Sequence, residues 1–173
     1  RNAGRSLANW DFLKKLREFW TGHLIVKGVS SIPDAQQIKN IGADAIWVSN
    51  HGGRQLDSAP AAISILPHIR DALGPAYPLI LDSGVRGGED ILKALVCGAN
   101  FAMLGRPWLY AIGAEGDKGL QNLLQALSVD LSIAMAQIGV RSIKEIGRQN
   151  LVGFDKVRGV IETQDITLAK LAR

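Results

Sequence analysis

Residues 41–57 read Ile-Gly-Ala-Asp-Ala-Ile-Trp-Val-Ser-Asn-His-Gly-Gly-Arg-Gln-Leu-Asp. A glycine that can end a helix is followed by the short apolar run Ala45–Val48, a pattern typical of a parallel strand buried on both faces. His51 and Arg54 come soon after that run, with two glycines between them. The stretch therefore predicts one unit of an α/β fold, with polar side chains at the carboxyl end of its strand.

Further runs of the same kind predict four strands and four helices in alternation. The expected strands are Leu24–Lys27, Ala45–Val48, Leu79–Asp82 and Phe101–Leu104. The expected helices follow Ser31 and end at Gly42, follow Pro60 and end near Gly74, follow Gly87-Gly88 and end at Gly98, and span residues 119–138. Serine caps and prolines at the starts, and glycines at the ends, favour these boundaries.

An internal repeat supports the same register. Ile41–Asp44 and Cys97–Asn100 both pass from a helix end into a strand, and Leu24–Lys27 and Leu79–Asp82 recur at nearly the same spacing. Alternating βα units form either a doubly wound sheet or a barrel. A complete eight-stranded barrel takes about 200 to 250 residues, so the 173 residues and four units predict half of a (β/α)8 TIM barrel.

Polar residues stand at or after the end of every expected strand. They are Lys27 after the first, His51 and Arg54 after the second, Asp82 and Arg86 after the third, and Gly105-Arg106 after the fourth. Ligands of parallel α/β folds bind at these carboxyl ends. A histidine there can take a proton and an arginine can hold a carboxylate in a two-pronged ion pair. Taken alone, a His-Gly-Gly sequence more often indicates a polar surface turn.

The last two loops have the composition of a phosphate site. Residues 83–88 lead into a helix, so their backbone N–H groups can face an anion, and Gly105-Arg106 adds a glycine and a guanidinium. The alternative is a glycine turn with surface arginines, and the motif alone does not specify a cofactor. Lys27 follows three apolar residues and could pair with a buried carboxylate such as Asp82 or stabilise an anionic ligand.

Composition excludes several classes of protein. Apolar residues make up 47% of the chain and the net charge is +4 without an arginine-rich arm, so we expect neither disorder nor nucleic-acid binding. No cluster of residues has metal-ligand spacing. The one cysteine, Cys97, is expected to be a small buried residue in a reducing compartment. No apolar run approaches about 20 residues, so a cytoplasmic location is expected, or one peripheral to the inner membrane for a full enzyme.

The ends of the chain are less regular. Residues 9–21 predict an amphipathic helix outside the first strand, and residues 141–173 a helical extension. We divide the chain into a half-barrel, residues 1–152, and a C-terminal extension, residues 153–173. His68 is expected at the surface. Because Arg1 stands where a methionine is usual, we expect a fragment or a processed product.

Three segments resemble a known family. Ser49–Asp57, Leu81–Gly88 and Leu104–Pro107 are similar to the active-site sequences of the FMN-dependent 2-hydroxy acid oxidases and dehydrogenases, which include glycolate oxidase, L-lactate dehydrogenase and mandelate dehydrogenase. The resemblance spans about residues 10–152 and corresponds to the C-terminal half of the barrel. It implies FMN as the cofactor and oxidation of an (S)-2-hydroxy acid, such as L-lactate or glycolate, to the 2-oxo acid.

The resemblance also assigns roles to individual residues. His51 would be the catalytic base, Arg54 the anchor of the substrate carboxylate, and Lys27 a catalytic contact to the flavin ring near N1 and O2. Ser49 would touch the flavin or its ribityl chain. The ribityl chain and phosphate would be held by Asp82, Gly84, Arg86, Gly105 and Arg106.

The family's first half has no counterpart in this chain. The resemblance implies that the missing half supplies two substrate-facing tyrosines, a second arginine and the aspartate that orients the histidine. We therefore expect the chain to need the missing N-terminal half or to self-associate, and the full enzyme to be a homo-oligomer. Two alternatives are another phosphate-binding TIM-barrel enzyme and a non-catalytic phosphate-binding half-barrel.

Overall fold

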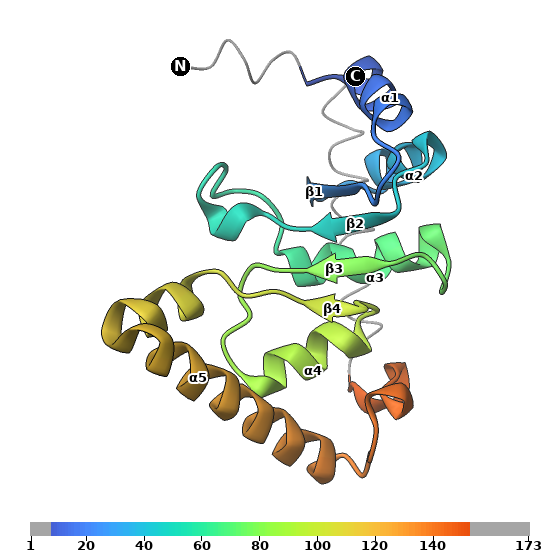
Figure 1. The fold of residues 1–173 in the computed structure, drawn as a ribbon. Coiled ribbons are helices and arrows are strands. Elements are labelled where there is room, and N and C mark those ends of the chain that lie inside the picture. Colours follow the sequence, from blue (N-terminus) through green and yellow to red (C-terminus); the bar gives the residue numbers. More distant parts are fainter. Residues whose placement is uncertain (1–7, 153–173) are drawn as a thin grey trace.

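Four parallel strands lie side by side in chain order, and a helix follows each of them (Figure 1). The computed structural model describes residues 8–152. The strands are β1 (Ile25–Val29), β2 (Ala45–Val48), β3 (Leu79–Leu81) and β4 (Phe101–Ala102). The helices are α2 (Ile32–Ile41), α3 (Ala62–Leu73), α4 (Gly88–Val96) and α5 (Arg106–Gln137), and α1 (Trp10–Phe19) precedes the sheet. The predicted alternation of strands and helices is confirmed.

The boundaries of α2 follow the predicted signals. The Ser31 hydroxyl accepts a hydrogen bond from the Asp34 amide (3.4 Å), and Pro33 occupies the first turn. Gly42 ends the helix at φ 93°, a left-handed conformation that favours glycine. These contacts satisfy backbone groups at both helix ends.

The start of α5 differs from the prediction. The helix begins at Arg106, well before Gly119, and bends at Glu115 and Gly116. The structure gives Gly119 a packing role, because a Cβ at this position would lie 2.0 Å from the Ala111 carbonyl oxygen.

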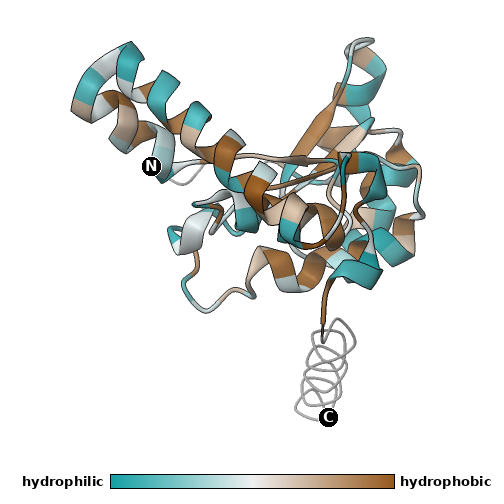
Figure 2. Ribbon diagram, turned by 90° about the horizontal axis from the view of Figure 1, so that it is seen from below, coloured by the Kyte–Doolittle hydropathy of each residue, from teal (hydrophilic) through white to brown (hydrophobic). Residues whose placement is uncertain are grey.

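The core lies between the sheet and the helices that cover one face of it. Figure 2 shows that hydrophobic residues lie along the strands and on the sides of the helices that face them. The other face of the sheet is open, and so are its two edge strands: Ile25 of β1 is 47% exposed and Phe101 of β4 is 59% exposed. A closed barrel encloses that face with further strands, so these four strands form one side of a barrel. The fully buried core side chains include Ile46, Leu66, Ile69, Leu79 and Leu81.

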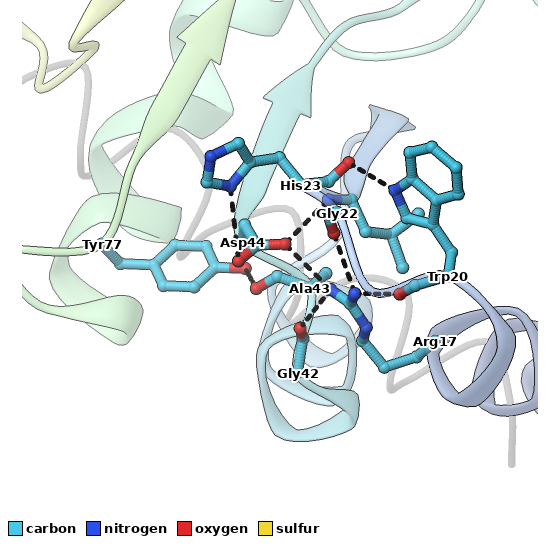
Figure 3. A network of polar contacts seen from close by, with 9 residues as sticks. Arg17, Trp20, Gly22, His23, Gly42, Ala43, Asp44 and Tyr77 are labelled. Atoms are coloured by element: carbon cyan, nitrogen blue, oxygen red, sulfur yellow. Dashed lines mark hydrogen bonds and ion pairs between the residues drawn. The ribbon is translucent and has the colours of Figure 1, made fainter.

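The amino ends of β1 and β2 are joined to α1 by Arg17 (Figure 3). Its guanidinium forms an ion pair with Asp44 (2.9 Å) and donates to the carbonyls of Trp20, Gly22 (2.8 Å) and Gly42 (3.4 Å). Asp44 also accepts from the Leu24 amide (2.7 Å). This hydrogen bond, with the Arg17 interaction, outweighs desolvation and lowers the pKa of Asp44.

A second arginine, Arg70 of α3, fixes the amino ends of β3 and β4. It is 8% exposed and donates to the Gly98 carbonyl from two nitrogens (2.9 and 2.7 Å). It also donates to the Asn100 side chain (2.7 Å) and to three carbonyls of the loop before β3. Desolvation lowers the pKa of Arg70. Its hydrogen bonds replace the water that a buried guanidinium loses.

Two further expectations have different outcomes. His68 is partly exposed, so the surface prediction holds only in part: its Nε2 is buried without a hydrogen-bond partner, because α3 is buried over much of its circumference. Cys97 is buried as expected, and desolvation raises the pKa of its thiol.

No helix within residues 8–152 is long and apolar enough to cross a membrane. Of the expected helical extension, residues 141–152 contain two short 3-10 helices, Ile143–Glu145 and Arg148–Asn150, instead of a continuous helix. Residues 153–173, the expected C-terminal extension, lie outside the described residues.

Candidate functional site

The turn that carries the histidine is left-handed. His51, Gly52 and Gly53 have φ values of 55°, 66° and 78° in succession. Glycine adopts these angles without steric cost, whereas an L side chain pays about 1–2 kcal/mol. The two glycines thus follow from the shape of the turn, and His51 is the residue that bears strain in it.

Gly28 of β1 has no side chain, and this leaves room for the imidazole of His51. A Cβ at Gly28 would lie 2.8 Å from His51 Cε1, closer than real Cβ contacts permit. Gly28 itself has φ 92°, and the pairing of β1 with β2 shifts register between Lys27 and Val29. The ring of His51 therefore lies against the backbone of the neighbouring strand.

Lys27 ends the regular part of β1 and is held by three groups. Its Nζ lies 3.0 Å from Asp82 Oδ2, 3.0 Å from Ser49 Oγ and 4.7 Å from the centre of the Trp47 ring. The proposed pairing with Asp82 is confirmed. The Lys27 side chain is still 36% exposed, so its ammonium can also interact with a ligand on the open side.

Asp82 joins the second and third loops. Burial alone would raise its pKa, but hydrogen bonds from Ser49, Ser83 and Lys27, together with the Lys27 charge, lower the pKa below its ordinary value. The carboxylate is therefore ionised at neutral pH and balances the Lys27 ammonium.

A cavity of about 580 Å³ opens at the carboxyl ends of the strands. It brings together every predicted site residue except Ser49, which is 1% exposed and accepts a hydrogen bond from Lys27. Arg106 reaches from the start of α5 toward the His51 turn, and its NH2 group lies 3.2 Å from the position of a Cβ on Gly52. The predicted lining residues are Lys27, His51, Arg54, Asp82, Gly84, Arg86, Gly105 and Arg106.

The expectation for the backbone amides before α4 is wrong in part. The amides of Arg86 (3.0 Å) and Gly87 (3.2 Å) donate to Asp90, and the amide of Gly88 donates to Asp130 of α5. Two carboxylates of the chain thus occupy the helix N-terminus, as the acidic first turn favours. An anion in the cavity would instead meet the guanidinium groups of Arg86 and Arg106.

Open space beside two glycines fits a bulky anionic cofactor. A Cβ at Gly84 or at Gly105 would have no atom within 4 Å. Both glycines line the cavity together with Arg86 and Arg106. The residues present therefore supply positive charge and close backbone access, the two properties that a flavin phosphate requires.

Sequence reasoning missed several lining residues. Tyr110 was missed because the start of α5 was placed too late. Ser83 was given no role of its own, although a hydroxyl next to Asp82 at the end of a strand could have suggested one. The cavity is also lined by Gly52, Ser83, Val85, Met103, Pro107, Leu109 and Tyr110.

Comparison with known proteins agrees with this geometry. Residues 1–153 match the family described as FMN-dependent dehydrogenase. The chain belongs to the FMN-dependent dehydrogenase family. Membership in this family implies FMN as the cofactor, and the curated relatives are L-lactate dehydrogenases.

Individual relatives define what the chain spans. An L-lactate dehydrogenase of Vibrio cholerae serotype O1 (strain M66-2) is 42% identical over 144 residues, which cover 83% of this chain and 38% of the relative. A soluble mutant of the membrane-associated (S)-mandelate dehydrogenase of Pseudomonas putida is 39% identical, with a TM-score of 0.78 over 82% of this chain and 40% of that one. A mandelate oxidase with benzoyl-formic acid is 36% identical, with a TM-score of 0.76 over 79% and 41% of the two chains. The chain thus spans about two fifths of the length of these TIM-barrel enzymes.

Proposed function

We propose that this chain forms the base-bearing and phosphate-binding side of an enzyme that oxidises an (S)-2-hydroxy acid to the 2-oxo acid. The observation that carries the proposal is one cavity lined by His51, Arg54 and the Arg86–Arg106 pair of guanidinium groups. A proton acceptor, a carboxylate anchor and a phosphate site are then present together. L-Lactate and glycolate are the substrates that we propose to test first.

Each residue has a separate task in this reaction. Arg54 binds the substrate carboxylate in a two-pronged ion pair, which orients the C2 hydroxyl group. His51 accepts the proton of that hydroxyl group. When bound, FMN would supply the acceptor for the C2 hydrogen and for the two electrons of the C2–H bond. Lys27 holds positive charge next to the ring site, while Ser49 and Asp82 hold Lys27 in place.

Different side chains of the one cavity bind the phosphate and the reacting group. We assign Arg86 and Arg106 to the phosphate, with Gly84 and Gly105 allowing close approach of the ribityl and phosphate groups. A polyanion between two guanidinium groups gains charge-assisted hydrogen bonds of the strong class. This division of roles predicts that changes at His51 alter turnover and leave FMN bound.

The rest of the barrel is the partner that the proposal requires. Within residues 8–152 the histidine that lies near a carboxylate is His23, whose Nδ1 is 3.9 Å from Asp44 at the far end of the sheet. His51 therefore needs an orienting group from strands beyond these four. We propose that the N-terminal half of the barrel supplies it and covers the open edges β1 and β4, in a cytoplasmic or membrane-peripheral enzyme that is a homo-oligomer.

An absorption spectrum and a substrate titration test the proposal. The purified enzyme that contains this chain is expected to show oxidised flavin bands, and anaerobic L-lactate or glycolate is expected to bleach them with formation of the 2-oxo acid. D-Lactate serves as the matched control and should not bleach the flavin. A protein that binds no flavin, or a flavin that no (S)-2-hydroxy acid reduces, would contradict the proposed function.

A further inference from the structure

Ser83, the first residue after β3, has a backbone conformation that needs a reason. Its φ is 76°, and within residues 8–152 the only other residue besides glycine with a positive φ is His51. Such a conformation costs a residue other than glycine about 1–2 kcal/mol. Strained residues persist where the surrounding contacts determine them, and they cluster at functional sites.

The hydroxyl group of Ser83 makes all the hydrogen bonds that it can make. It donates to Asp82 Oδ1 (2.8 Å) and accepts from the amides of Asn50 (3.3 Å) and Gly52 (3.2 Å). A hydroxyl group has one donor and two acceptor positions. An ionised carboxylate only accepts and an amide N–H only donates, so the direction of each bond is fixed.

These contacts reach both sides of His51. The amide of His51 donates to Ser49 Oγ (3.1 Å), and the amide of Gly52, the next residue, donates to Ser83 Oγ. Ser49 in turn accepts from Lys27, which is paired with Asp82. Two serine hydroxyls and one Lys27–Asp82 ion pair thus hold the strained turn from both ends.

We propose that Ser83 is a positioning residue, whose hydroxyl group fixes the His51 turn to the Lys27–Asp82 pair and so aims the imidazole at the substrate. This inference rests on the proposed role of His51 as a base. Ser83 touches neither the carboxylate anchor Arg54 nor the phosphate arginines through its hydroxyl group. Its loss should therefore lower kcat much more than it changes KM or FMN affinity.

Ser83→Gly and Ser83→Ala together separate the hydroxyl group from the backbone. Glycine accepts φ 76° without strain, whereas alanine bears the same strain as serine, and both lack the hydroxyl group. We expect kcat of the flavin-loaded enzyme to fall by about 10- to 100-fold in both variants, the loss typical of a misaligned catalytic group. Hydrogen–deuterium exchange of residues 49–57 should become faster in both.

Two outcomes would overturn the proposal. If Ser83→Gly matches the unmodified enzyme in kcat and in exchange while Ser83→Ala is impaired, only the backbone conformation matters and the proposal is overturned. A parallel loss of kcat, FMN affinity and thermal stability would also overturn it, because that pattern is a general structural effect. If the unmodified enzyme oxidises no 2-hydroxy acid, the proposed function fails, but exchange of residues 49–57 still decides whether Ser83 fixes the His51 turn.

Discussion

At the amino ends of the strands, the guanidinium groups of Arg17 (Figure 3) and of Arg70 donate to backbone carbonyls. At the carboxyl ends, Arg54 and Arg106 instead line a cavity. The same residue type thus serves two purposes on one sheet. Arginine surrounded by carbonyls has its hydrogen-bonding capacity filled by the chain and adds rigidity. Arginine facing a cavity keeps that capacity for a ligand.

Backbone strain is distributed in the same way. The two residues other than glycine with positive φ within the described ranges, His51 and Ser83, both follow strands at the carboxyl end. At the amino end, side chains instead hold the backbone: the Tyr77 hydroxyl group donates a hydrogen bond to the Ala43 carbonyl (2.7 Å). Desolvation of this hydroxyl group raises the pKa of Tyr77 to about 12. Changes at the amino end should therefore alter stability, and changes at the carboxyl end should alter chemistry.

The largest effect is expected from His51→Ala. Loss of a general base costs about 10²–10⁴-fold in turnover, and FMN should stay bound because the phosphate arginines are untouched. Steady-state turnover with L-lactate and the flavin absorbance measure the two parts. His23→Ala, which changes an exposed histidine at the amino end, is the control and should leave turnover intact. Near-normal turnover in His51→Ala would remove the base from the mechanism.

The strongest perturbation of the amino end is Arg70→Met. Several carbonyls would lose their donor in a buried site, which typically destabilises a protein by about 3 kcal/mol. Urea unfolding should show a lower midpoint, while the folded fraction keeps its turnover. Arg141→Met changes an exposed arginine and serves as the control. An unchanged midpoint for Arg70→Met would show that this cluster does not stabilise the sheet.

Arg54→Lys should affect substrate binding more than the chemical step. Lysine keeps the positive charge but cannot form a two-pronged pair with a carboxylate, so KM for the 2-hydroxy acid should rise by about tenfold. A concentration series of substrate measures the change, and Arg141→Lys is the matched control. If the KM of Arg54→Lys equals that of the unmodified enzyme, another residue anchors the carboxylate.

The smallest expected effect is on the stability of the folded protein at acidic pH. Because the folded protein lowers the pKa of Asp82, this group stabilises the fold above its unfolded pKa of about 3.9, and that contribution is lost as the pH falls through the folded value. Unfolding midpoints from neutral to acidic pH should therefore fall less steeply for Asp82→Asn than for the unmodified chain. Equal slopes would mean that Asp82 does not contribute.

The sequence predicted the elements well because their signals are local. Ser31 and Gly42 bound α2 where the pattern placed them, and the apolar run Ala45–Val48 is β2 as predicted. The meeting of His51, Arg54 and Asp82 also followed, since carboxyl ends of neighbouring parallel strands lie together.

What could not be predicted depends on contacts between distant segments. The capture of the Gly88 amide by Asp130 requires α5 to pack against α4, and no spacing in the sequence shows that packing. The role of Ser83 likewise depends on Asn50 and Gly52, which lie in a different loop. The first turns of α5 contain Gly113, Gly116 and Gly119, and the close approach of Gly119 to Ala111 is known only from the structure.

The bare backbone at Gly28 has an evolutionary consequence. Because His51 Cε1 lies where a side chain at position 28 would begin, the two positions cannot diverge independently. A lineage that keeps the histidine must keep glycine on the neighbouring strand. A lineage that replaces the histidine with a smaller residue gains room for a side chain there, although the positive φ still favours glycine. Among relatives, the loss of glycine at position 28 should therefore mark enzymes whose chemistry no longer depends on this base.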